Sequence, residues 1–204
     1  MTALRGVTGI VLAAGFSRRL GQPKQLLDLD GKPLLQWAID AANGADLDEV
    51  LVVLGDNAAD ILERIDLGRA KIVLNPNARQ GQSASIVSGV AAANPSRSGT
   101  LLMLGDQPEI TPEDLNRLLA AFDHEPDSIL IVSWNGETRS PVVFGREYDD
   151  ELLKLTGDRG ARPLLSAHLD KLQRLPIDRP VPMDVDTEAD YQRLLELWNA
   201  SKSS

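Results

Sequence analysis

The chain has 204 residues, enough for one large domain with its own core, and 43% apolar and 25% charged residues are ordinary for a globular protein. The chain has 30 acidic and only 21 basic residues, so its formal net charge is -9. This charge argues against nucleic acid as the main partner. The absence of cysteine excludes disulfides, thiolate metal sites and cysteine nucleophiles, and it suits a cytoplasmic protein.

The N-terminal segment is similar to a signal peptide, because Arg5 precedes the apolar run GVTGIVLAAGF. Arg18 and Arg19 follow at once, however, and the run is too short to span a bilayer. No other apolar run approaches membrane length. We therefore expect neither a signal peptide nor a membrane partner.

Short apolar runs rich in leucine and β-branched residues predict buried strands at GIVLA, EVLVVL, KIVL, TLLMLG, SILIVS and PVVF. Helical spacing of apolar residues appears between most of them, in PLLQWAIDAAN, ASIVSGVAAAN and EDLNRLLAAF. Continuously apolar strands imply burial on both faces, so we predict an α/β protein with a Rossmann-like three-layer architecture and a mainly parallel sheet. The run PVVF could begin an antiparallel excursion.

The last predicted element is a helix over EADYQRLLELW, followed by the polar tail NASKSS. No linker or internal repeat divides the chain. We therefore expect residues 1–199 to form a single domain and residues 200–204 to form a flexible tail.

A loop with three cations follows the first predicted strand, in the sequence GFSRRLGQPK. Gly15 and Gly21 allow close backbone approach, and Arg18, Arg19 and Lys24 supply positive charge at the carboxyl end of a strand, where α/β proteins bind ligands. This pattern predicts a phosphate site. The spacing matches neither the dinucleotide fingerprint nor the P-loop, and a solvated turn remains the alternative.

Two later segments place aspartates where a metal could bind. In TLLMLGDQPEITPEDL, Asp106 follows a buried strand beside the expected phosphate loop, a suitable place for Mg²⁺; the alternative is a simple turn with Pro108 fixing the bend. In VPMDVDTEADY, Asp184 and Asp186 would alternate on one face of a strand, and Asp190 would cap the helix that follows. The distance from Asp106 to this second pair cannot be read from sequence.

The segment LAAGFSRRLGQPK resembles the L-A-[AG]-G-x-S-x-R-[ML]-G-x-x-K signature of the MobA-like NTP transferases, which include the molybdenum cofactor cytidylyl- and guanylyltransferases. The resemblance extends through five motifs over residues 8 to 198. It implies that the loop wraps the triphosphate of an NTP and that Arg19 and Lys24 act on the phosphates in catalysis. The nucleotide-binding positions implied by this segment are Leu12, Ala13, Ala14, Gly15, Ser17, Arg18, Arg19 and Lys24.

The same resemblance implies that Asp106, as a catalytic residue, and Asp186 hold Mg²⁺, with Asp184 in support. The segment NPNARQGQSASIVSGV is similar to one that borders the nucleotide, so Gln82 and Ser83 would read a base edge. A plain helix N-terminus rich in capping residues is the alternative there.

A further segment, LTGDRGARPLL, resembles the family's G-D-x-G-[AV]-R motif, with arginine where lysine is commoner. By this resemblance it lines the acceptor side of the site. The implied acceptor-binding residues are Gly157, Asp158, Gly160 and Arg162.

Together these motifs imply a nucleotidyltransferase that moves a nucleoside monophosphate from an NTP to a phosphorylated acceptor and releases pyrophosphate. The form LAAG resembles the cytidylyl branch, which favours CTP as donor and the molybdenum cofactor as acceptor, with a molybdoenzyme as the client. Two alternatives stay open: another phosphorylated acceptor, such as a sugar or polyol phosphate, and a non-catalytic maturation protein that binds nucleotide or cofactor.

Overall fold

The computed structural model describes residues 6–17 and 20–202. Seven strands form one sheet in this part of the chain: β1 (Val7–Leu12), β4 (Glu49–Leu54), β5 (Lys71–Leu74), β6 (Gly99–Leu104), β7 (Ile129–Trp134), β8 (Glu137–Gly145) and β9 (Leu172–Ile177). A small hairpin pairs β2 (Asp28–Leu29) with β3 (Lys32–Pro33).

The α-helices are α1 (Leu34–Gly44), α2 (Ala58–Leu62), α3 (Gln82–Ala92), α4 (Pro112–Ala121), α5 (Asp149–Leu152), α6 (Arg162–Ala167) and α7 (Glu188–Lys202). Short 3₁₀ helices lie at η1 (Lys24–Leu26), η2 (Ala78–Gln80) and η3 (Arg146–Tyr148). None of the helices in the described ranges is long and apolar enough to cross a membrane.

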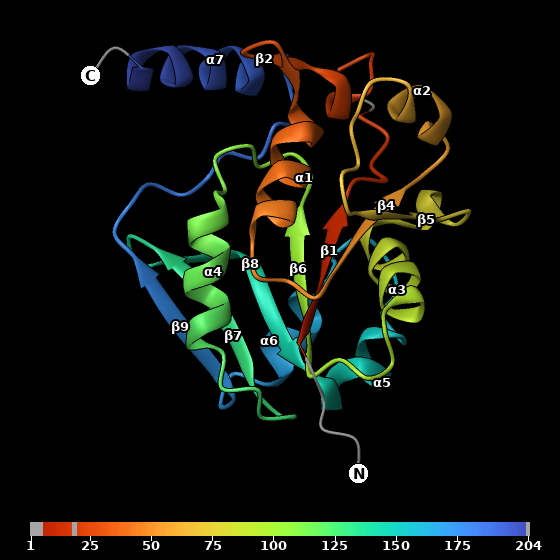
Figure 1. The fold of residues 1–204 in the computed structure, drawn as a ribbon, viewed down its shortest axis with the longest axis vertical. Helices are drawn as coiled ribbons and strands as arrows, with labels where there is room; N and C mark the ends of the chain where they lie inside the picture. The colour runs from red at the N-terminus through yellow and green to blue at the C-terminus, as the bar shows by residue number, and fades with distance from the viewer. Residues whose placement is uncertain (1–5, 18–19, 203–204) are drawn as a thin grey trace.

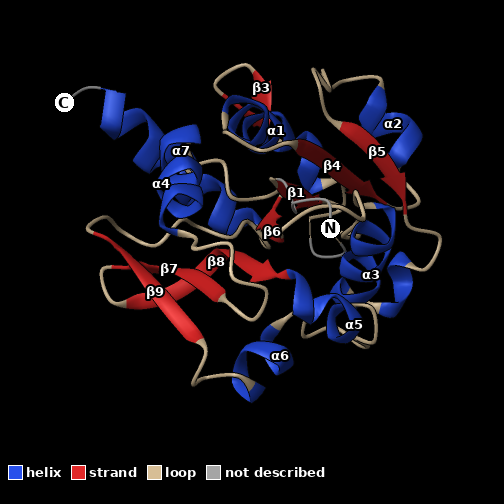
Figure 2. Ribbon diagram, turned by 60° about the horizontal axis from the view of Figure 1, so that its bottom comes forward, coloured by secondary structure: helices blue, strands red, loops and turns tan. Residues whose placement is uncertain are grey.

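The strand order is β5-β4-β1-β6-β8-β7-β9, and only β8 among these strands runs antiparallel to its neighbours. The predicted mainly parallel sheet is therefore confirmed, and so is the antiparallel excursion at PVVF, which lies inside β8. Helices cover both faces of the sheet, with α1 and α4 on one side and α3, α5 and α6 on the other (Figures 1 and 2).

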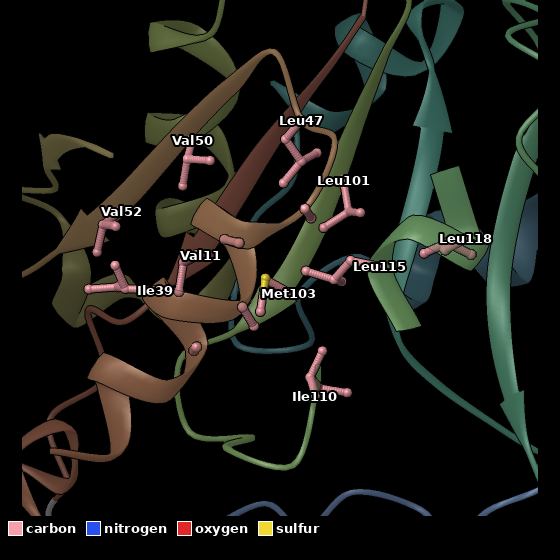
Figure 3. Packing of buried hydrophobic residues seen from close by; sticks show 14 of the residues in the cluster. Val11, Ile39, Leu47, Val50, Val52, Leu101, Met103, Ile110, Leu115 and Leu118 are labelled. Carbon is pink, nitrogen blue, oxygen red and sulfur yellow. The ribbon is translucent and has the colours of Figure 1, made fainter. Parts of the chain in front are cut away.

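The continuous apolar runs are explained by these two covered faces. Successive residues of a strand point to opposite faces, so Val11 and Val52 pack with α1 and α4, whereas Ile10 and Val53 pack with α3. Figure 3 shows the first of these clusters, in which Val11 and Met103 of the sheet lie beside the helices that cover it. A buried sheet of this kind holds the carboxyl ends of β1, β4 and β6 in fixed relative positions.

Three local expectations differ from the structure. Asp184 and Asp186 do not lie on a strand, because residues 178–187 have no regular secondary structure. The edge strand β9 was not predicted, since polar residues and Pro176 interrupt its apolar pattern. Helix α7 continues to Lys202, so it takes in residues 200–202 of the predicted flexible tail.

Helix α7 packs on the β2–β3 hairpin instead of on the main sheet. Leu29 and Leu34 form a small third cluster with Val185 and Leu194, all of them buried. Asp190 accepts a hydrogen bond from the Thr187 backbone N–H at 2.8 Å, and this confirms its predicted capping role. The irregular segment with Asp184 and Asp186 is thus anchored at its centre by the buried Val185 side chain.

Candidate functional site

A cleft of about 800 Å³ opens at the carboxyl ends of β1 and β6. It is bounded by the loop after β1, the start of α3, the loop after β6, the start of β8 and the loop before α6. The predicted site residues that line it are Leu12, Ala13, Ala14, Gly15, Ser17, Lys24, Gln82, Asp106, Asp158, Arg162, Asp184 and Asp186. Segments from all five sequence motifs therefore meet in one place.

The loop after β1 is held by hydrogen bonds from two residues of η1. Gln25 is buried, and its amide donates to the carbonyl oxygens of Ala13 at 2.7 Å and Gly15 at 2.9 Å. The Ser17 hydroxyl oxygen accepts from the Lys24 backbone N–H at 2.8 Å. The loop thus folds back and places Lys24 at the carboxyl ends of the strands. Sequence reasoning missed Gln25, although a polar residue inside the run KQLL was a usable signal.

Lys24 lies between the two carboxylates that were predicted to hold a metal. Its ammonium contacts the Asp106 carboxylate and lies 2.8 Å from Oδ1 of Asp186. The side chains of Lys24 and Asp106 are only 16% and 13% exposed, whereas that of Asp186 is 59% exposed. The fold therefore brings Asp106 and Asp186 to a single cation.

Burial and charge oppose each other in this cluster. Burial lowers the pKa of Lys24, but Asp106 and Asp186 together outweigh it and raise the pKa overall, so the amine stays an ammonium at neutral pH. Burial raises the pKa of Asp106, and the nearby Asp184 and Asp186 carboxylates add to the effect against the attraction of Lys24. The three aspartates thus form an anionic cluster, and the positive charge of Lys24 compensates part of their negative charge.

Gln107 connects three parts of the site. It is 1% exposed, its amide N–H donates to Oδ1 of Asp184 at 2.7 Å, and its carbonyl oxygen accepts from the Ser140 hydroxyl at 2.8 Å. Arg139 lies 3.9 Å from the other oxygen of Asp184. Gln107 therefore positions the irregular segment that carries Asp184 and Asp186, a function that sequence reasoning had not assigned to it or to Ser140.

Ser83 does not lie where sequence reasoning placed it. Its side chain is 0% exposed and does not line the cleft, and its hydroxyl donates to the carbonyl oxygen of Thr156 at 3.2 Å. Its backbone N–H donates to the carbonyl oxygen of Gly157 at 3.2 Å. Ser83 thus fastens the start of α3 to the loop before α6, and a base edge cannot reach it.

The loop before α6 contributes side chains and not glycines to the cleft. Gly157 and Gly160 have φ of 79° and 55°, which suits turn residues, and they lie outside the lining, so the acceptor contacts expected of them stay predictions. Asp158 and Arg162 do line it, and Asp158 also accepts from the Gln82 backbone N–H at 3.1 Å.

Arg18 and Arg19 lie outside the described residues, so their expected phosphate contacts stay predictions. Other cations of the cleft lining are Arg79, Arg139, Arg159 and Arg162. Within the described ranges, no three His, Cys, Asp or Glu side chains group as metal ligands. The Asp106–Asp186 pair still fits Mg²⁺, because one or two carboxylates commonly suffice when phosphate and water supply the remaining oxygens.

Known proteins are similar to this chain in sequence and in fold. The model of the MobA-like NTP transferase domain matches residues 9–172. A nicotine blue oxidoreductase from Paenarthrobacter nicotinovorans is 33% identical over 95% of this chain and 98% of its own length. The purine catabolism protein PucB from Bacillus subtilis is 34% identical over 78% of this chain and 80% of its own.

Among solved structures, Rv0371c from Mycobacterium tuberculosis superposes with a TM-score of 0.86 at 34% identity, covering 95% of this chain and 99% of that chain. A second structure of Rv0371c is a complex with manganese; its TM-score is 0.83 at 32% identity, covering 94% and 99% of the two chains. The domain match spans the part of the cleft that lies between β1 and the beginning of β9, whereas the segment with Asp184 and Asp186 follows the matched range. The chain therefore belongs to the MobA-like NTP transferase family of nucleotidyltransferases.

Proposed function

We propose that the protein transfers a nucleoside monophosphate from CTP to a phosphorylated acceptor, the molybdenum cofactor, and releases pyrophosphate. The observation that carries this proposal is the convergence of Asp106 and Asp186 on one cation inside a cleft lined by the loop of the NTP transferase signature. Asp106 and Asp186 would hold Mg²⁺. The bound metal would neutralise charge on the triphosphate and on the departing pyrophosphate.

The reaction needs no general base from the protein. A phosphate oxygen of the acceptor, already an anion at neutral pH, forms a bond to the α-phosphorus of the NTP. The bond from that phosphorus to the bridging oxygen breaks, and its electron pair leaves with pyrophosphate. The protein contributes alignment and charge neutralisation: Gln25 holds the phosphate loop in one conformation, and Lys24 offsets phosphate charge.

The sheet order suggests where each substrate lies. Asp106 follows β6, with β1 and β4 on one side of it and β8 and β7 on the other. The nucleotide would lie over the loop after β1, and the acceptor over the start of β8. Leu102, Ile131 and Val142 line the cleft on this second side, with Arg139 beside them. An apolar wall beside a cation supports a phosphorylated acceptor with a ring system over a polyhydroxylated sugar phosphate.

The test is pyrophosphate release from each of the four NTPs, with molybdenum cofactor, with a sugar phosphate and with no acceptor. We expect release that depends on CTP, divalent metal and molybdenum cofactor together. Release with the sugar phosphate alone would reassign the acceptor, and NTP binding without turnover would favour a maturation protein. Because one relative is named an oxidoreductase, oxidation of NADH or NADPH without any NTP is followed in parallel.

The proposal also includes a cytoplasmic location for the protein and a molybdoenzyme as the client that receives the cofactor.

Base preference gives a first prediction. Ala14 is 7% exposed and lines the cleft. We propose that its methyl group fills space that a purine would need. We expect kcat/KM for CTP to exceed that for GTP by about ten- to two-hundredfold, as one methyl group in a pocket typically provides. Ala14→Gly should narrow this gap, whereas Ala121→Gly, at the exposed end of α4, should leave it unchanged. Equal use of GTP by the wild-type enzyme would contradict the cytidylyl assignment but not NTP transfer.

A further inference from the structure

The cation that lies between Asp106 and Asp186 is the Lys24 ammonium. We propose that Lys24 occupies the divalent-metal position until an NTP arrives, so that metal and triphosphate bind together and neither binds tightly alone. This inference rests on the proposed function. It gives Lys24, besides its phosphate contact, the role of making metal binding and nucleotide binding depend on each other.

Metal alone meets an obstacle at this site. A divalent ion between Asp106 and Asp186 must displace the ammonium, because the two positive charges cannot share the position. The Lys24 side chain is 16% exposed, and its ion pairs are with these two carboxylates. A partly buried ammonium that loses both partners is unfavourable. The metal therefore gains its ligands at the cost of an unpaired cation.

A triphosphate alone meets the opposite obstacle. While Lys24 is held by Asp106 and Asp186, its charge is already compensated and contributes little to phosphate binding. The cleft lining carries the Asp106 and Asp186 carboxylates at Lys24, and that of Asp184 in the same segment as Asp186. Their negative charges repel the phosphates. The arginines of the lining still attract phosphate, but these carboxylates oppose them beside Lys24, so nucleotide should bind less tightly without metal than with it.

When metal and triphosphate bind together, each removes the unfavourable interaction that the other would meet alone. The metal replaces the ammonium at Asp106 and Asp186, and the ammonium finds a new anionic partner in the triphosphate. The backbone of Lys24 can remain in place, since its N–H is bonded to the Ser17 hydroxyl at 2.8 Å and its flexible four-carbon side chain can reorient. Each substrate therefore raises the affinity for the other by the same factor, as linkage requires.

The first test measures Mn²⁺ binding to the nucleotide-free protein, with free Mn²⁺ detected by electron paramagnetic resonance. Lys24→Met removes the competing ammonium, so its affinity for Mn²⁺ should rise at least about tenfold above wild type, within the usual range of such coupling. Lys32→Met is the matched control: it removes one lysine charge from a partly exposed pair with Asp40 and should leave the affinity unchanged. Adding Asp106→Asn to the Lys24→Met variant should abolish the gain, which assigns the ion to this site.

The second test separates this role from a plain phosphate contact. Calorimetry measures the affinity for CTP, or for whichever NTP supports pyrophosphate release, with Mg²⁺ and with EDTA. Lys24→Met should reduce the affinity at least about tenfold with Mg²⁺ and less than about twofold in EDTA, because the wild-type ammonium is not available to phosphate without metal.

An Mn²⁺ affinity that does not rise in Lys24→Met, or an equal loss of NTP affinity with and without Mg²⁺, overturns the proposal. Wild-type pyrophosphate release is assayed separately, so these results leave the proposed function standing. Thermal unfolding of each variant checks the fold, and Lys24→Gln serves in place of the methionine variant if that protein does not fold.

Discussion

Asp106→Asn is expected to lower turnover at least about a hundredfold while the protein keeps its fold. The substitution keeps the volume of the side chain but removes an anionic oxygen ligand from the site where a divalent metal would sit. It also removes one of the two charges that compensate the partly buried Lys24. The measurement is pyrophosphate release at saturating Mg²⁺, with circular dichroism to verify the fold.

Asp40→Asn provides the matched control for this result. Asp40 also forms an ion pair with a lysine, but its side chain is 43% exposed and lies away from the cleft lining. Exposed pairs contribute little, so we expect turnover within about twofold of wild type. Near-normal turnover of Asp106→Asn at saturating Mg²⁺ would remove Asp106 from the mechanism.

Gly81→Ala is expected to destabilise the protein by at least about 2 kcal/mol and to weaken nucleotide binding. Gly81 has a φ of 108°, and an added methyl carbon would lie 2.6 Å from the carbonyl oxygen of Gly157 and 2.8 Å from Cα of Asp158. Both contacts are with backbone that cannot rotate away. The start of α3 would therefore separate from the loop before α6, and two walls of the cleft would shift.

Urea unfolding measures the change in stability, and calorimetry measures NTP affinity in the same variant. Gly136→Ala separates the clash from the backbone strain, because Gly136 has a φ of 89° but open space around it. It should cost about 1 kcal/mol and leave NTP affinity unchanged. If Gly81→Ala were no more destabilising than Gly136→Ala, tight packing of α3 against the second loop would not be important for the site.

The sequence predicted the fold well wherever a local pattern has one structural meaning. The runs GIVLA and TLLMLG are apolar on both faces, and such strands fit only a sheet covered on both sides. The run EDLNRLLAAF predicted α4, which begins in the structure with a capping box between Thr111 and Asp114. The edge strand β9 escaped prediction because solvent on one side removes the apolar pattern.

The sequence by itself also determined the chemical character of the site: a glycine loop with cations after one strand and an aspartate after another predict phosphate and metal chemistry. Only the tertiary structure decided which side chains share the cleft. Asp106 and Asp186 meet because α7 packs on the β2–β3 hairpin and Gln107 holds the preceding segment. Ser83, with equally suitable chemistry, is buried under the neighbouring loop. Residue type sets what a side chain can bind, whereas long-range packing sets whether it can reach a ligand.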